Sequence, residues 1–372
     1  MEDTAQIFGG ILGNRLALRL LENALSSGGA SHAYLFHGPS GIGKRIVAYR
    51  FGAALVSDGD EGAMGRALRA LHPDLVEVEP EGRFTTIGQV REVVRLAASR
   101  PFEGTRMVFI LRADTLNVQA ANALLKTLEE PEGGAVFVLL AASREGVLPT
   151  ILSRAQEVRF DPVPPGEVVS FLVERGHPEG EAKTAAALGR GSIGLSLRYA
   201  EEEELRRLRE AVVRAGLSLG ASFEERHGMV EEIVAGAESV GAAREAAYLV
   251  GMEDADGEPD RRRKEAAKRL GRAARDGAVA EALDLLALLY RDAAVIAAGA
   301  GELVANADRI PEIRARVEER AGADWAGAAR AFGEARGELA YNVSPEAILE
   351  VALSQMGQKI SGSSLKGSFP GS

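Results

Sequence analysis

Residues 31–56 read SHAYLFHGPSGIGKRIVAYRFGAALV, and this stretch decides the fold of the N-terminal part of the chain. The apolar run at 33–36 predicts a buried strand, the glycines that follow predict a tight loop, and residues 44–56 predict a helix. Residues 38–45, GPSGIGKR, satisfy the phosphate-loop pattern G-x-x-x-x-G-K. A strand, a glycine-rich loop and a helix in this order are typical of a nucleotide-binding α/β domain.

The loop carries the groups that hold phosphate but lacks the group that holds magnesium. In loops of this kind, backbone N–H groups turn toward phosphate oxygens at a helix N-terminus, and the lysine adds a positive charge. Arg45 stands where a Ser or Thr hydroxyl ordinarily coordinates Mg²⁺, and a guanidinium cannot coordinate a cation. The sequence therefore predicts a degenerate nucleotide site, with a purely structural glycine-rich turn as the alternative. Its residues are Gly38, Pro39, Ser40, Gly41, Ile42, Gly43, Lys44 and Arg45.

Strands and helices alternate around this loop up to about residue 160. Apolar runs predict further strands at 74–79, 107–111 and 135–142, and helical spacing predicts helices at 15–25, 87–99 and 118–130. The inner strands are apolar throughout, which indicates a parallel sheet covered on both faces. The predicted fold class is an α/β P-loop domain with a parallel sheet flanked by helices.

A working hydrolytic site also needs carboxylates at the end of a neighbouring strand. The strand at 107–111 ends in Leu111 and Arg112, where an acidic pair is expected. Asp114, two residues further on, has two interpretations: an acid of a loop or helix entry, which we favour, and a metal ligand. The loss of the hydroxyl together with the acidic pair argues against hydrolysis.

The α/β alternation ends at Asp161-Pro162-Val163-Pro164-Pro165, where the prolines predict a stiff hinge. Helices are predicted beyond it at 166–175, 179–188, 193–213, 223–248, 260–298, 308–337 and 344–356. The charged run at 251–264 is expected to be an exposed loop, and the Gly/Ser-rich end to be disordered. We therefore divide the chain into an α/β domain at 1–161, a small helical domain at 162–210, a larger helical domain at 211–358 and a tail at 359–372.

Composition excludes several classes of function. The 372 residues contain no cysteine, which rules out disulfides, thiolate zinc sites, iron–sulfur clusters and a cysteine nucleophile. The net charge is −10, and residues 161–372 hold 27 basic and 36 acidic side chains against 17 and 18 in residues 1–160. Such acidity argues against a free-standing DNA binder. Acids near the N-terminus and the lack of an apolar run of about 20 residues predict a cytoplasmic protein with no membrane segment.

Four segments together resemble the clamp-loader branch of the AAA+ ATPases: SHAYLFHGPSGIGK at 31–44, HPD at 72–74, AANALLKTLEEP at 120–131 and LPTILSRA at 148–155. Within that branch the chain is similar to the delta-prime subunits of bacterial DNA polymerase III, closely over 5–160 and only in outline over the last 160 residues. The resemblance implies an AAA+ domain, a small helical lid and an all-α collar. It also implies a hetero-pentamer with gamma/tau-type motor subunits and a delta subunit, which places a sliding clamp on primer–template DNA.

Four elements of the family's hydrolysis machinery are altered in this chain, and Arg45 is one of them. Leu111 and Arg112 replace an Asp-Glu pair, and alanines at 141 and 142 occupy the region of a polar phosphate sensor. Gly194 falls on the position of a second sensing arginine. These losses are the ones that separate delta-prime subunits from the motor subunits.

One charged element of the family is kept. Ser153-Arg154-Ala155 resembles the family's Ser-Arg-Cys motif, in which the arginine is a finger that enters the nucleotide site of the neighbouring subunit. The resemblance therefore implies that Arg154 acts in trans as a catalytic residue, while Ser153 either caps the next segment or positions the finger. The alternative for Arg154 is a surface arginine paired with a local acid.

These observations predict a stator subunit of the DNA replication clamp loader without independent ATPase activity. An active ATPase motor of the same fold and a stand-alone nucleotide-binding regulator are the alternatives. No cofactor is certain, and weak binding of ATP or ADP without hydrolysis is left open. Zinc is not expected, because delta-prime relatives usually carry a four-cysteine module in the interval that corresponds to 56–71, and this interval has no thiol here.

Overall fold

The computed structural model describes residues 7–69, 71–80, 84–103, 106–131, 133–218, 222–250, 261–339 and 344–360. The chain divides into two compact units, one of residues 1–176 and 189–196 and one of residues 177–188 and 197–372. The predicted division at residues 161, 210 and 358 differs from this one and stays a prediction.

The first unit is built on a five-stranded parallel sheet in the order β2-β3-β4-β1-β5. Its central strand β1 pairs with β4 on one side and with β5 on the other, so that Leu35 lies between Leu139 and Glu157. The loop after His37 therefore leaves the carboxyl edge of the sheet, where ligands bind in open α/β folds. The strands are β1 (Ala33–His37), β2 (Leu75–Val78), β3 (Val108–Arg112), β4 (Val136–Ala141) and β5 (Gln156–Arg159).

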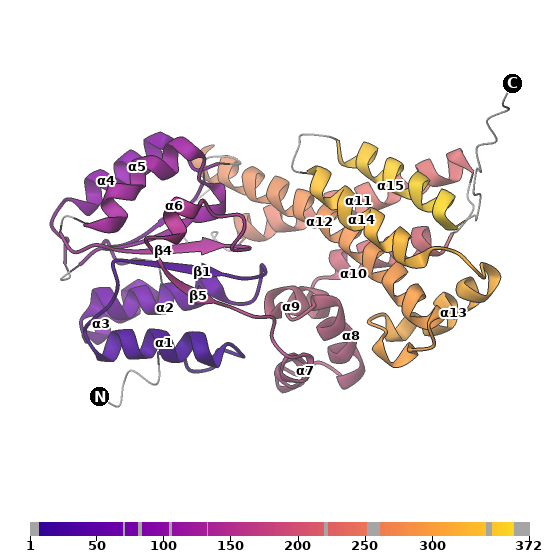
Figure 1. Cartoon of the computed structure of the whole chain (residues 1–372), viewed down its shortest axis with the longest axis horizontal. Coiled ribbons are helices and arrows are strands. Elements are labelled where there is room, and N and C mark those ends of the chain that lie inside the picture. Colours follow the sequence, from indigo (N-terminus) through magenta and orange to yellow (C-terminus); the bar gives the residue numbers. More distant parts are fainter. Residues whose placement is uncertain are drawn as a thin grey trace, which may run out of the picture. The chain divides into compact units, whose positions relative to one another are not determined.

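Helices cover both faces of this sheet (Figure 1). Tyr34 and Phe36 of β1 pack into one apolar core with Phe51, whereas Leu35 packs into the opposite core with Leu124. Burial on both faces explains why the inner strands are apolar throughout. The predicted fold class, a parallel sheet flanked by helices and followed by helical regions, is confirmed. One face carries α1 (Arg15–Ser26), α2 (Lys44–Ser57) and α3 (Glu61–Leu68), and the other carries α4 (Ile87–Ala97), α5 (Val118–Glu129) and α6 (Pro149–Leu152).

The sequence pattern misses β5 because this strand is mostly polar. Gln156 and Arg159 are exposed, Glu157 is half-buried, and only Val158 is buried. The strand forms at the edge of the sheet, where backbone pairing with β1 suffices to hold it. The short helices α3 and α6 are also absent from the sequence prediction, and α3 fills the interval in which no zinc module is expected.

After β5, residues 161–164 have no regular secondary structure, and α7 (Pro165–Glu174) begins at the last proline of the predicted hinge. The N–H of Val163 donates to the carbonyl of Gly191 at 3.0 Å, which ties the hinge to residues 189–196. Gly191 has a φ of 81°, and a Cβ there would lie 2.5 Å from the Pro162 side chain. A glycine is therefore needed at this contact.

The remaining elements are helical, as predicted, but two predicted helices are each split. The stretch 193–213 is interrupted at Glu202, and the stretch 308–337 is interrupted at residues 320–324. Residues 261–264, expected in a loop, begin a helix, and Lys359 and Ile360, expected in the tail, end one. The rest of both predictions, at 251–260 and 361–372, lies outside the described residues. The helices are α8 (Glu179–Gly189), α9 (Ile193–Glu201), α10 (Glu203–Leu217), α11 (Phe223–Val250), α12 (Arg261–Ala297), α13 (Ile310–Glu319), α14 (Trp325–Glu338) and α15 (Pro345–Ile360).

The second unit is organised around the long helix α12, which lies beside α11 (Figure 1). Gly241 and Gly271 allow the two backbones to approach, because a Cβ on Gly241 would lie 2.8 Å from the carbonyl oxygen of Gly271. Further along α12, the buried ring of Tyr290 stacks on Phe332, and its hydroxyl donates to the carbonyl of Gly216 at 2.5 Å. Of the helices in the described ranges, none has the length and apolar character needed to cross a membrane.

Candidate functional site

The phosphate-type loop joins β1 to α2 and depends on three glycines with positive φ. Gly38, Gly41 and Gly43 have φ values of 145°, 77° and 96°. A Cβ at Gly38 would lie 2.1 Å from the carbonyl oxygen of Phe160, so the close approach of the loop to the end of β5 also requires glycine. The local sequence thus determines the loop conformation that its pattern predicts.

Lys44, the first residue of α2, turns back onto its own loop. Its Nζ donates to the carbonyl oxygens of Gly38 and Pro39, both at 2.6 Å, and the residue is 9% exposed. Desolvation lowers the pKa of Lys44 to about 8, with a further decrease from the Arg112 charge, and the carboxylate of Asp114 opposes this shift. The lysine is thus held by the carbonyl dipoles of its own loop in a weakly hydrated position.

Arg45, in the place of the metal-binding hydroxyl, is held by two acids of the β2 segment. Its Nη2 donates to Glu77, and to Oε1 of Glu79 at 3.1 Å. The hydroxyl of Tyr49 also donates to Glu77, at 2.5 Å, and burial together with this hydrogen bond raises the pKa of Tyr49 to about 12. The sequence prediction did not include these acids, although their alternation in DLVEVE places both on one side of a strand and indicates a cationic partner.

The end of β3 carries an internal ion pair where an acidic pair was expected. Nε and Nη2 of Arg112 each lie 3.3 Å from a carboxylate oxygen of Asp114. The backbone N–H of Ala142, just after β4, also donates to Asp114 at 3.3 Å. Asp114 lies in a 3₁₀ turn, Ala113–Thr115, and its carboxylate accepts donors from two strand ends. These contacts favour a structural acid over a metal ligand.

Residues 189–196 contact the apex of the loop within the same unit. The N–H of Gly194 donates to the carbonyl of Gly41 at 3.2 Å, and a Cβ on Gly41 would lie 2.1 Å from Oγ of Ser192. Gly194, which the resemblance places at a sensing arginine, is therefore brought to the loop, but it has no side chain with which to reach phosphate. Ser192 is a contact that the sequence prediction did not include.

Arg154 is paired with an acid of its own chain. Its Nη2 forms an ion pair with Glu129 at the end of α5, and its Nη1 donates to the carbonyl of Thr150 at 3.0 Å and to Oγ of Ser153 at 3.2 Å. Its side chain is 29% exposed, and that of Glu129 is 50% exposed. Water reaches both partners, so the pair is weak enough to exchange. Ser153 steadies the guanidinium and also donates to the carbonyl of Thr150 at 3.2 Å.

The structure does not bring Arg154 to its own phosphate-type loop. Arg154 comes just before β5, whose first residue, Gln156, pairs with Tyr34 near the start of β1. The loop leaves the opposite end of β1, after His37. Because all five strands are parallel, Arg154 lies at the amino edge of the sheet and the loop at its carboxyl edge. Any phosphate that Arg154 contacts must come from outside this loop.

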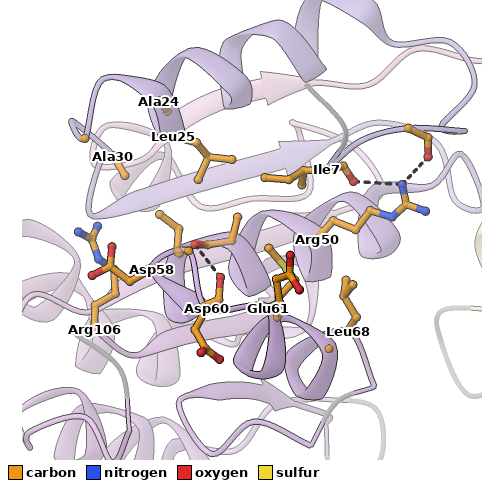
Figure 2. A pocket seen from close by; sticks show the side chains of 18 residues that line it. Ile7, Ala24, Leu25, Ala30, Arg50, Asp58, Asp60, Glu61, Leu68 and Arg106 are labelled. Atoms are coloured by element: carbon orange, nitrogen blue, oxygen red, sulfur yellow. Dashed lines mark hydrogen bonds between the residues drawn. The ribbon is translucent and has the colours of Figure 1, made fainter. Parts of the chain in front are cut away.

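A cavity of about 740 Å³ lies between α1, α2 and α3 (Figure 2). Its wall is partly apolar, with Leu25 and Leu55, and Arg50 lies at one end, where Nη1 donates to the carbonyls of Ile7 at 3.1 Å and Gly9 at 2.6 Å. The cavity is separate from the loop, because it lies at the far end of α2. Among the described residues, no cluster of three or more His, Asp or Glu side chains could hold a metal ion.

Comparison with known proteins finds relatives of the first unit. Residues 13–164 match the model of the family described as DNA polymerase III, delta subunit. DNA polymerase III subunit delta' of Pseudomonas aeruginosa is 42% identical over 135 residues, which cover 33% of this chain and 41% of that protein. Subunit delta' of Bacillus subtilis is 31% identical over 166 residues, covering 42% and 50%. The chain thus spans half or less of the length of these relatives, and over that span the resemblance to delta-prime subunits is confirmed.

A relative with another subunit name also matches the chain. DNA polymerase III subunit tau of Bacillus subtilis is 32% identical over 165 residues, which cover 42% of this chain and 29% of that protein. Among solved structures, a DNA polymerase III gamma subunit-related protein of Thermotoga maritima aligns with a TM-score of 0.41 and 18% identity, covering 91% of this chain and 99% of that one. A score this low carries no argument, so the fold assignment rests on the sheet topology.

Proposed function

Since residues 13–164 match the model of the family described as DNA polymerase III, delta subunit, we propose that the chain is a clamp-loader subunit that does not hydrolyse ATP and that donates Arg154 to the ATP site of a neighbouring motor subunit. Its proposed partners are gamma/tau-type motor subunits and a delta subunit in a hetero-pentamer. The sliding clamp and primer–template DNA are contacted through that assembly.

The observation that carries the proposal is the position of Arg45. A hydroxyl at this place coordinates the Mg²⁺ that neutralises the transferring phosphate. Here a guanidinium held by Glu77 and Glu79 takes that place. The carboxylate expected at the end of β3 is replaced by Arg112, which is engaged with Asp114. Two cations therefore stand where a metal and its ligands would have to be.

Whether nucleotide enters the loop without hydrolysis is a separate part of the proposal. Lys44 already has two carbonyl partners at 2.6 Å, and Gly41 is in contact with residues 192–194. A bound phosphate would have to draw Lys44 from these carbonyls and displace the covering segment. We expect ATP or ADP to bind weakly at most, and never with turnover.

The finger role is supported by the place of Arg154 in the sheet. It lies at the edge opposite its own loop, and its partner Glu129 is half-exposed, so another subunit can approach it. An arginine donated in trans stabilises charge on the transferring phosphoryl group and contributes about 10³–10⁵ in rate at the site it enters. In the assembly, a phosphate of the neighbouring subunit's ATP would replace Glu129 as the anionic partner of Arg154.

Reconstitution with motor and delta subunits tests the finger. We expect Arg154→Ala to reduce DNA-stimulated ATP hydrolysis at the adjacent site by about 10³-fold or more. Arg159→Ala is the matched control, because Arg159 is an exposed arginine on β5 that pairs with Asp161. Arg154→Lys should restore little activity, since a lysine cannot reproduce the planar guanidinium. Normal turnover by the Arg154→Ala assembly would refute the assignment.

The alternative, an active motor of the same fold, makes a different prediction for the chain alone. It requires Mg²⁺-dependent ATP turnover that Lys44→Ala abolishes. The proposed subunit gives no turnover above a buffer control, with or without the substitution. A phosphate-release assay on the purified chain separates the two functions before any partner is added.

A further inference from the structure

The first half of α12 carries a stripe of positive charge in the acidic part of the chain. Lys264, Lys268 and Arg272 follow one another at intervals of four residues and are all exposed, so they share one face of the helix. We call these three residues the basic stripe. In residues 261–276 there are eight basic and two acidic side chains, although residues 161–372 as a whole carry nine more acids than bases.

The stripe lacks the acidic partners that other cations of this unit have. Arg207, Arg214 and Arg336 each form an ion pair with an acid. Within the described ranges, by contrast, no acidic side chain lies at ion-pair distance from the three residues of the stripe. Glu245 of α11 comes close to α12 at Gly271 but pairs with none of them. Among the residues that the structure describes, the positive charges of the stripe therefore have no acidic partner.

This arrangement opposes helix stability in two ways. Like charges four residues apart destabilise a helix by about 0.2–0.5 kcal/mol per pair. Cations in the first turns also interact unfavourably with the positive end of the helix dipole, and α12 has no acidic residue in its first turn. A partner with closely spaced negative charges would relieve both effects.

We propose that the basic stripe binds the phosphate backbone of double-stranded nucleic acid without reading its sequence. Four residues of helix span about 6 Å. Phosphates of one strand of B-DNA follow at about 3.4 Å along the axis. Because the strand also winds around the axis, successive phosphates lie farther apart in space than this rise, and the spacing of the cations is close to that of adjacent phosphates of one strand. Single strands are usually held on exposed aromatic side chains, and the stripe contains none.

This proposal is independent of the proposed clamp-loader role, because it concerns the isolated chain. Binding of a fluorescein-labelled 30-base-pair DNA duplex to the full-length protein is measured by anisotropy between 50 and 200 mM salt. Three phosphate contacts predict a slope of about −2.7 in log K against log salt, which corresponds to about a 40-fold loss of affinity over this range.

The deciding variant replaces Lys264, Lys268 and Arg272 together by glutamine. We expect its affinity at 50 mM salt to fall at least about tenfold and its salt slope to approach zero. The matched control is Arg207→Gln with Arg214→Gln and Arg336→Gln, which removes the same charge from paired arginines of the same unit. This control should keep the wild-type slope. Circular dichroism should find the stripe variant as helical as the wild type, because glutamine favours helix and the like-charge repulsion is gone.

Three results would overturn the inference. The first is equal binding by the stripe variant and the wild type. The second is an equal loss in the control, which would attribute the effect to net charge. The third is that poly-glutamate displaces the labelled duplex as effectively as unlabelled duplex of equal charge does. That result would indicate that the stripe binds an acidic protein.

Discussion

Lys44 is the residue whose chemistry is most altered by its surroundings. Its pKa is lowered to about 8 from an ordinary value of 10.5, chiefly by desolvation. The protonated form is therefore disfavoured in the folded chain relative to the unfolded chain. This destabilisation is complete below pH 8 and disappears as the pH rises toward 10.5, so Lys44 contributes a rise in stability over that interval.

Titration of lysine side chains by NMR checks this assignment. We expect one lysine resonance with a midpoint near pH 8. Lys44→Met should remove the early signal alone. A millimolar addition of ATP should leave its midpoint unchanged if the loop carbonyls keep the lysine, whereas a bound phosphate would raise it. Titration of every lysine above pH 10 would contradict the buried position.

Alanine substitutions at two loop glycines test the contact between the loop and residues 189–196. Gly41 and Gly43 both have positive φ, so alanine is strained at either position by about 1–2 kcal/mol. Only at Gly41 does the new Cβ meet a neighbour, Oγ of Ser192 at 2.1 Å, while Gly43 has open space. Gly41→Ala should therefore lower the midpoint of urea unfolding more than Gly43→Ala, and adding Ser192→Ala should recover part of the difference. Equal effects of the two single changes would show that the covering segment is not held to the loop.

Among the helices and strands, the sequence predicts the elements in which buried apolar residues follow a regular pattern. The three inner strands, β1, β3 and β4, are apolar along almost their whole length and were predicted within one or two residues, as was the edge strand β2. The edge strand β5 was not, because backbone pairing with β1 holds it rather than side-chain burial. The breaks at Glu202 and at residues 320–324 were also missed; Glu202 carries no glycine or proline, and the signal at 320–324 is a single glycine, Gly322, with a φ of 86°.

Two glycine-to-alanine substitutions in α11 test its close crossing with α12, because we expect them to change stability in opposite directions. Gly241→Ala would place a Cβ 2.8 Å from the carbonyl of Gly271 and 3.0 Å from Cβ of Arg275, and should destabilise the second unit by about 1–3 kcal/mol. Gly228→Ala, in the same helix but with nothing within 4 Å, should stabilise it by about 1 kcal/mol because alanine favours helix. Trp325, the single tryptophan, reports this unit in a urea titration followed by fluorescence. Stabilisation by both substitutions would mean that the helices do not cross this closely.

At the scale of the whole molecule, the sequence predicted the separate parts of the candidate site better than their contacts. The loop pattern and the altered residues Arg45 and Arg112 were visible in the sequence, but Glu77 and Glu79, the acidic partners of Arg45, come from another segment. The contact between Gly41 and Ser192 joins positions 151 residues apart, and no periodicity reports such a separation. The net charge of residues 161–372 does not reveal the basic stripe for a related reason. It is a sum over the whole range, whereas the three residues of the stripe come together on one face through the helical repeat.

The proposed assembly gives the last prediction. Mixed with gamma/tau-type and delta subunits, the chain should sediment as part of a larger complex, whereas a stand-alone regulator would sediment as the free chain. Arg154→Ala should enter that complex as well as the wild type. Among the described residues Arg154 forms an ion pair with Glu129, which is weak and costs at most about 1 kcal/mol to lose, and its hydrogen bonds go to its neighbours Thr150 and Ser153. Sedimentation velocity on both proteins therefore separates assembly from catalysis: a complex that forms but turns over slowly indicates a finger. Failure of Arg154→Ala to assemble would instead make the residue an interface contact, and failure of the wild type to assemble would remove the clamp-loader proposal.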